Sequence, residues 1–133
     1  MLGEQISEGQ GKRTGRRVVA TDPHLKVEVS FEEMTKLLGA DGLNIGTYIS
    51  YPKPGGSLHG EGEGVFASLD GEMAAWRAIG VGQFGPDGSV RYRGTLSFNT
   101  LSQKLIRLNS MAGMFEFDVD AQGNTRSKIW GGK

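Results

Sequence analysis

The sequence contains no cysteine, which excludes disulfide bonds, thiolate metal ligands and thiol nucleophiles together. Its 15 basic and 15 acidic residues cancel, so no overall charge draws the chain to nucleic acid or to an anionic membrane. The one basic cluster, "KRTGRR" (12–17), has no stacking aromatic residues beside it. No apolar run approaches the roughly 18 residues of a membrane span. We expect a soluble, cytoplasmic protein without cofactor, metal, nucleic-acid or membrane partner.

Proline is scarce and glycine abundant, with 4 prolines and 22 glycines in 133 residues. The sequence also shows little helical periodicity. Apolar and polar residues alternate with the period of two that half-buried strands require. Only segment 100–113 has leucines at helical spacing, and it is expected to form a short helical turn or an irregular crossing. We therefore predict one all-β domain, 1–133, folded as an antiparallel up-and-down barrel of about eight strands. A two-sheet sandwich is the alternative.

Glycine-containing turns predict where the strands meet. Three-residue hairpin loops, with glycine in the left-handed position, are predicted at "LDG", "PDG", "ADG" and "AQG", and a four-residue loop at "KPGG". These loops are residues 69–71, 86–88, 40–42, 121–123 and 53–56. The expected cross-strand pairs are Gly60–Gly80, Gly62–Ala78, Gly64–Trp76, Gly80–Gly94, Gly82–Tyr92, Trp76–Phe98, Asp118–Arg126 and Glu116–Lys128.

The same registers predict which side chains enter the barrel. The inward face of segment 58–98 holds its glycines together with Leu58, Phe66, Trp76, Phe84, Val90, Tyr92, Leu96 and Phe98. Its outward face holds Glu61, Glu63, Arg77, Arg91, Arg93 and Asn99, with Glu63 and Arg77 forming an ion pair. Strand 25–33 is expected to point four side chains inward, Leu25, Val27, Val29 and Phe31. Strand 43–51 is expected to do the same with Leu43, Ile45, Ile49 and Tyr51. Stretch 3–19 is expected to be one long or bent strand.

The stretch "GVGQFG" (80–85) matches the glycine fingerprint of a dinucleotide-binding loop. That loop needs a helix directly after it, but Pro-Asp-Gly and another strand follow, so we reject the match. The glycines at 60, 62, 80, 82 and 94 are instead expected to form an inward patch of bare backbone. Large side chains such as Trp76 and Tyr92 could cover this patch, segment 100–113 or a chain end could plug it, or a small ligand could occupy it.

Glu33 is the candidate for acid–base chemistry. It is expected to point inward with Thr35, Thr47 and Tyr51, where burial would raise its pKa. A bulge in "FEEM" would turn it outward instead.

His59, Glu61 and Glu63 alternate along one strand, with Ser50 expected beside His59 and Tyr48 beside Glu61. This spacing suits a metal site or a pair of acid–base groups. Strand parity, however, places the three residues on the solvated outer face.

Most of the chain after residue 45 resembles a family of small prokaryotic barrel domains. The resemblance rests on "GEGEGVFASLDGEMAAW" (60–76), "GVGQF" (80–84), "RGTLSF" (93–98) and "KLIRLNSMAGMFEFDVDAQGN" (104–124). These domains are related in architecture to the calycin-like barrel of allene oxide cyclase and, more distantly, to dirigent proteins. The resemblance implies an antiparallel barrel of about eight strands that often self-associates. No catalytic residue of the cyclase maps onto this sequence, so it implies no activity.

Three functions are compatible with these features. We expect first a barrel that binds a small, mainly apolar molecule without catalysis. The second candidate is a homo-oligomeric assembly module that uses outward Tyr48, Met114 and Trp130. The third is a small isomerase or cyclase in which Glu33 or Tyr92 moves a proton. The candidate ligand-binding residues are Trp76, Tyr92, Phe98, Gly62, Gly80, Gly94 and Glu33.

Overall fold

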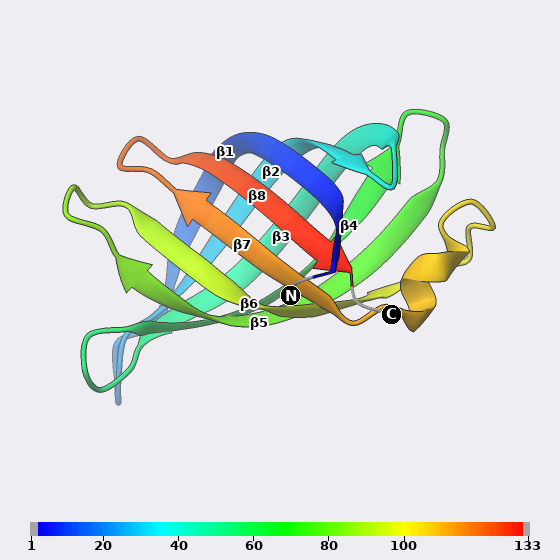
Figure 1. The fold of residues 1–133 in the computed structure, drawn as a ribbon. Helices are drawn as coiled ribbons and strands as arrows, with labels where there is room; N and C mark the ends of the chain where they lie inside the picture. The colour runs from blue at the N-terminus through cyan, green and yellow to red at the C-terminus, as the bar shows by residue number, and fades with distance from the viewer. Residues whose placement is uncertain (1–2, 132–133) are drawn as a thin grey trace.

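The computed structural model describes residues 3–131, which form a closed antiparallel barrel of eight strands (Figure 1). The strands are β1 (Glu4–Ala20), β2 (Lys26–Leu37), β3 (Ala40–Pro52), β4 (Leu58–Ser68), β5 (Met73–Phe84), β6 (Val90–Asn99), β7 (Gly113–Val119) and β8 (Asn124–Gly131). Each strand pairs with the next, and β1 pairs with β8 to close the barrel. The predicted all-β, up-and-down barrel is confirmed, as is the long first strand, which is bent by irregularities between Arg13 and Gly15 and between Val18 and Ala20. No helix within residues 3–131 is long and apolar enough to cross a membrane.

Three of the predicted hairpin loops form as expected. In the loops 69–71, 86–88 and 121–123 the last residue is a glycine with φ of 91°, 87° and 86°, the left-handed conformation that only glycine adopts at little cost. The registers follow, and all the expected pairs across these loops are present, among them Gly64 opposite Trp76 and Gly80 opposite Gly94. Turn chemistry alone therefore fixes the register of β4, β5 and β6.

The two loops that flank β3 differ from the prediction. Leu37 pairs with Ala40, so the β2–β3 turn is the two-residue Leu38–Gly39 rather than 40–42. Both residues have positive φ, 49° and 83°, which is unusual for leucine. The Leu38 N–H donates to the Ile6 carbonyl at 2.8 Å, and its side chain packs on the core. These tertiary contacts hold a conformation that local sequence disfavours.

The β3–β4 loop contains five residues, 53–57, instead of four, because Pro52 pairs with Leu58. The errors in the β2–β3 and β3–β4 loops each shift the register of β3 by an odd number of residues. The side chains predicted to point into the barrel therefore point outward. Ile45 is 42% exposed, and Leu43, Ile49 and Tyr51 share its outward parity. The predicted inward set of β3 is therefore wrong. The residues that turn inward are Gly42, Asn44, Gly46 and Tyr48.

The segment between β6 and β7 closes one end of the barrel (Figure 1). It contains the 3-10 turn η1 (Ile106–Ser110), as the helical spacing of its leucines predicts. Leu105 and Leu108 are buried in a core cluster with residues of β1, β2, β4, β5 and β6. A second cluster, built around Phe31, Tyr92 and Phe117, occupies the other half of the interior. The barrel therefore has two apolar layers, one at each end.

Aromatic rings cover the bare backbone of the inward glycines. A Cβ on Gly64 would lie 2.4 Å from the Trp76 ring, and one on Gly46 would lie 2.7 Å from it. The Tyr92 ring lies in the same way over Gly60 and Gly82, at 2.9 and 2.6 Å from the positions of their Cβ atoms. Of the three fillings considered for the glycine patch, large side chains occupy most of it. The glycines are there to let these rings lie flat against the wall.

Charged residues line the outer face as predicted, but two ion pairs join different strands. Glu63 and Arg77 approach to 4.0 Å. Asp118 and Glu116 stand opposite Arg126 and Lys128 on β8, yet they pair with β6 instead, Asp118 with Arg91 at 3.0 Å and Glu116 with Arg93 at 3.2 Å. The predicted register is correct, but the same two acids also stand directly opposite Arg91 and Arg93 in the β6–β7 pair, and the ion pairs form there.

The contact between Gly64 and Trp76 yields a test of the packing. Gly64→Ala should lower the free energy of unfolding by about 1–3 kcal/mol, since the new methyl group meets the Trp76 ring and the Ile45 carbonyl. Gly15→Ala is the matched control, because nothing lies within 4 Å of its Cβ position. Urea denaturation of both variants measures the difference. Equal midpoints for the two would contradict the packing described.

Candidate functional site

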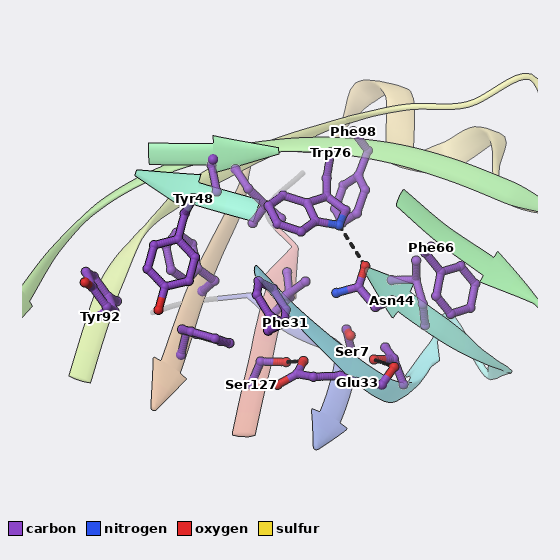
Figure 2. Close-up of a pocket in the computed structure, with 18 of the residues that line it drawn as sticks. Ser7, Phe31, Glu33, Asn44, Tyr48, Phe66, Trp76, Tyr92, Phe98 and Ser127 are labelled. Carbon is purple, nitrogen blue, oxygen red and sulfur yellow. Dashed lines mark hydrogen bonds between the residues drawn. The ribbon is translucent and has the colours of Figure 1, made fainter. Parts of the chain in front are cut away.

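A cavity of about 80 Å³ lies between the two apolar layers (Figure 2). Its walls are mainly aromatic, and they include Phe31, Tyr48, Phe66, Trp76, Tyr92, Phe98, Phe115 and Phe117. A smaller polar surface comes from β1, β2, β3 and β8, namely Ser7, Glu33, Thr35, Asn44 and Ser127. In Figure 2, Trp76 and Phe98 lie on one side of the cavity, and Glu33 and Ser127 lie on the other. The cavity is thus apolar with one hydrogen-bonding side.

Glu33 forms the centre of the polar side. It is 1% exposed, and its Oε1 accepts a hydrogen bond of 2.6 Å from the Ser127 hydroxyl. The site is made possible by Gly9, where a Cβ would lie 2.6 Å from Thr35 Oγ1 and 2.9 Å from Glu33 Oε1. Within residues 3–131, Glu33 Oε2 and the Thr125 hydroxyl are buried without a hydrogen-bond partner.

Burial raises the pKa of the Glu33 carboxyl, because desolvation outweighs the opposing effect of the hydrogen bond from Ser127. No basic side chain appears among the residues that line the cavity, in the part of the chain that the structure describes. A carboxylate there would be unpaired in an apolar surrounding, which is costly. The geometry therefore favours the neutral acid, which also gives the buried oxygen a proton to donate.

Asn44 is oriented by Trp76. The Trp76 indole N–H donates a hydrogen bond of 2.8 Å to Asn44 Oδ1 (Figure 2). This bond fixes the indole ring over Gly46 and Gly64 and also fixes which end of the amide faces it. Asn44 thus links the aromatic and polar sides of the cavity.

Tyr48 and Tyr92 lie toward the end of the cavity farther from η1, within the second cluster. Their rings meet edge to face with centroids 5.4 Å apart, and burial raises the pKa of both phenols. The Tyr92 hydroxyl is hydrogen-bonded to Ser50 at 2.8 Å. No hydrogen bond to the Tyr48 hydroxyl is formed within residues 3–131.

The structure brings most of the predicted site residues together. Trp76, Tyr92, Phe98, Gly62 and Glu33 all line the cavity. The other two, Gly80 and Gly94, oppose each other in the β5–β6 pair, and the ring of Phe115 lies over Gly80. Glu33 does point inward with Thr35, and no bulge interrupts the pairing of β2 with β3. Thr47 and Tyr51 point outward, contrary to the expectation for them.

Sequence reasoning missed Asn44 and Tyr48, the two polar groups that β3 supplies. Tyr48 was expected to be outward, beside Glu61, but it pairs with Gly62 and lines the cavity. Both errors follow from the reversed face of β3. The signal that could have found them is the Leu-Gly dipeptide at 38–39, read as a two-residue turn.

The outward titratable residues form no site of their own. His59 approaches Glu61 to 3.6 Å and stacks on Tyr51 with ring centroids 4.8 Å apart, on the outer face as expected. Ser50 pairs with Gly60 rather than with His59. Across residues 3–131, no group of three or more His, Asp or Glu residues is arranged to hold a metal ion.

Two solved structures share this fold. A protein with unknown function from Clostridium acetobutylicum ATCC 824 superposes with a TM-score of 0.83 at 12% sequence identity, covering 98% of each chain. A conserved protein of unknown function from Rhodopseudomonas palustris superposes with a TM-score of 0.75, also at 12% identity, covering 95% of each chain. Likeness at this identity shows the fold alone. No protein-family model and no curated protein matches the chain, so the likeness to allene oxide cyclase remains a prediction.

The buried Glu33 carboxyl should make stability depend on pH. Its pKa is raised in the folded state above the ordinary value of 4.5, so the folded chain binds this proton more tightly than the unfolded chain does. The free energy of unfolding should therefore fall as pH rises from about 4.5 through the raised value. Glu33→Gln, a neutral isostere, should abolish this decline. At pH values above the raised pKa of Glu33, the variant should be more stable than the wild type.

Glu63→Gln is the matched control, because the Glu63 side chain is 72% exposed on the outer face. Chemical denaturation between pH 4 and 9 measures all three proteins. If the curves of the wild type and Glu33→Gln run parallel, the carboxyl does not titrate as described.

Proposed function

We propose that this protein binds a small, mainly apolar molecule inside the barrel and does not transform it. The observation that carries the proposal is the cavity itself, an unfilled space walled by aromatic rings with a polar group on one side only. Specific small-molecule sites have this composition, in which apolar walls supply affinity and a few polar groups supply orientation. A barrel of eight strands has an interior that is either filled by side chains or holds one small ligand.

The size of the cavity limits the ligand. A cavity of about 150 Å³ holds benzene, and this one measures about 80 Å³. A compact molecule, or one that displaces the Tyr48 or Trp76 ring slightly, fits best. The best small ligands gain about 1.5 kcal/mol per non-hydrogen atom, so fragments should bind in the millimolar to micromolar range.

The hydrogen bonds of Glu33 and Tyr92, the two candidate acid–base groups, favour binding over catalysis. Ser127 occupies Glu33 Oε1, and Glu33 Oε2 is buried. The Tyr92 hydroxyl is bonded to Ser50. Each group is thus held by a neighbouring hydroxyl, and the one carboxyl oxygen without a partner within residues 3–131, Glu33 Oε2, is buried, which is a poor arrangement for general acid–base catalysis.

Filling the cavity should prevent binding. Ala78 lines it, whereas Ala75 is on the outward face of the same strand. Ala78→Ile should reduce the affinity for benzene and cyclopentane at least about tenfold, since the added carbons occupy the site, and Ala75→Ile should leave it unchanged. In a Trp130→Phe background Trp76 is the only tryptophan, so its fluorescence reports on occupancy. Equal binding by both variants would place the ligand elsewhere, and no binding by the parent protein would refute the proposal.

We also propose that the outer face associates with a second copy of the chain. One outward row of side chains, Met34, Leu43, Ala67 and Met73, runs across four paired strands, and Ile45, Val65 and Ala75 form the row beside it. Met34 and Met73 are 59% and 56% exposed, and an apolar surface of this kind is typical of a protein contact. Of the residues first considered for assembly, Met114 and Trp130 are paired on β7 and β8 with outward parity, whereas Tyr48 points inward.

Sedimentation velocity of the wild type and two variants tests this association. Met73→Glu should weaken it about tenfold or more, because a charge would be buried at the contact. Met114→Glu is the control on the remote face and should have no effect. A wild type that stays monomeric at high concentration would contradict the proposal.

A further inference from the structure

The orientation of the Asn44 amide determines what the cavity offers a ligand. An indole N–H can only donate, so the atom of Asn44 that meets Trp76 at 2.8 Å must be the carbonyl oxygen. The amide nitrogen is therefore turned away from Trp76, and Figure 2 shows it on the opposite side of the side chain. No acceptor among residues 3–131 forms a hydrogen bond with this nitrogen.

Charge in the cavity excludes ionic ligands of one sign. Its lining contains no lysine, arginine or histidine within the described chain, so an anionic ligand would lose its hydration without gaining a counter-ion. The carboxyl of Glu33 accepts a hydrogen bond from Ser127 through Oε1, and its burial raises its pKa, which disfavours the carboxylate that a cation would need. A second carboxylate, Glu61, is directed outward to His59. The cavity thus favours an uncharged molecule.

The aromatic walls of the cavity can pack against the apolar part of a ligand. Phe31 and Trp76 lie with ring centroids 6.3 Å apart, and Phe31 and Phe117 with centroids 4.7 Å apart, so flat aromatic surfaces border the space next to Asn44. Tyr48 adds a hydroxyl that has no partner within residues 3–131. An unpaired donor beside aromatic walls is satisfied by a ligand that carries one strong acceptor on a compact apolar frame.

We infer that the cavity selects neutral carbonyl compounds, with the carbonyl oxygen accepting a hydrogen bond from Asn44 Nδ2 and the apolar remainder lying against Phe31 and Trp76. This inference rests on the proposed binding function and names its ligand class. A carbonyl group satisfies the amide without introducing a donor that would itself need a partner. Trp76 is then a positioning residue, because it holds the amide in the orientation that exposes Nδ2.

The experiment compares cyclopentanone with cyclopentane, which has the same ring without the acceptor, and with cyclopentylamine, which is cationic. Binding to the wild-type chain is followed by the ¹H–¹⁵N signals of side-chain amides, and the Asn44 pair is assigned by its absence in Asn44→Leu. Cyclopentanone should bind about tenfold more tightly than cyclopentane and should shift the Asn44 amide signals. In Asn44→Leu the preference should disappear while cyclopentane still binds.

The outcomes separate this inference from the proposed function. If cyclopentane binds as tightly as cyclopentanone, or the Asn44 signals stay in place, the carbonyl assignment is wrong and the binding function stands. If cyclopentylamine binds most tightly, Glu33 rather than Asn44 selects the ligand. If no probe binds, both proposals fail. Should Asn44→Leu not fold, the ratio of the cyclopentanone and cyclopentane affinities of the wild type decides alone.

Discussion

The barrel depends on aromatic rings that lie directly on glycine backbone. Eight strands enclose a narrow interior, and rings the size of Trp76 and Tyr92 fit only where the facing wall carries no side chain. Gly46 and Gly64 provide that space for Trp76, and Gly60 and Gly82 provide it for Tyr92. Glycine weakens a strand, so this arrangement costs local stability, which the buried aromatic surface offsets. The rings are thereby held against the wall instead of filling the centre.

The central cavity follows from this arrangement. Because Trp76 lies flat on two glycines, its N–H reaches Asn44, which lines the cavity with its amide nitrogen turned away from the indole ring. The polar side opposite depends in the same way on Gly9, which leaves room for the Glu33 carboxyl and the hydroxyl of Thr35. A buried carboxyl with a raised pKa, an oriented amide and a set of aromatic walls together support the proposed binding of an uncharged, compact molecule.

Much of this architecture is encoded in local sequence. Asp-Gly and Gln-Gly turns specify loops 69–71, 86–88 and 121–123, and these gave the correct registers, the inward position of Trp76 and the outward ion pair of Glu63 with Arg77. Alternation on β2 placed Glu33 correctly. The errors concentrate on β3, because Leu38 takes a left-handed conformation that only its contacts with β1 and the core sustain. Asn44 and Tyr48, and with them part of the polar character of the cavity, were missed because the loops on both sides of β3 were predicted wrongly. The ion pairs of β7 were also not predicted, because Asp118 and Glu116 stand opposite a basic residue on both neighbouring strands and pair with those of β6.

The central claim is that an unfilled, largely apolar space persists in the middle of the barrel. A crystal structure of the protein under xenon pressure tests it most directly, since xenon enters dry cavities without needing any particular polar contact. A xenon atom is expected among Phe31, Trp76 and Phe98, with the Trp76 and Tyr92 rings still lying on their glycines. Side chains that meet at the barrel centre, leaving no xenon there, would contradict it.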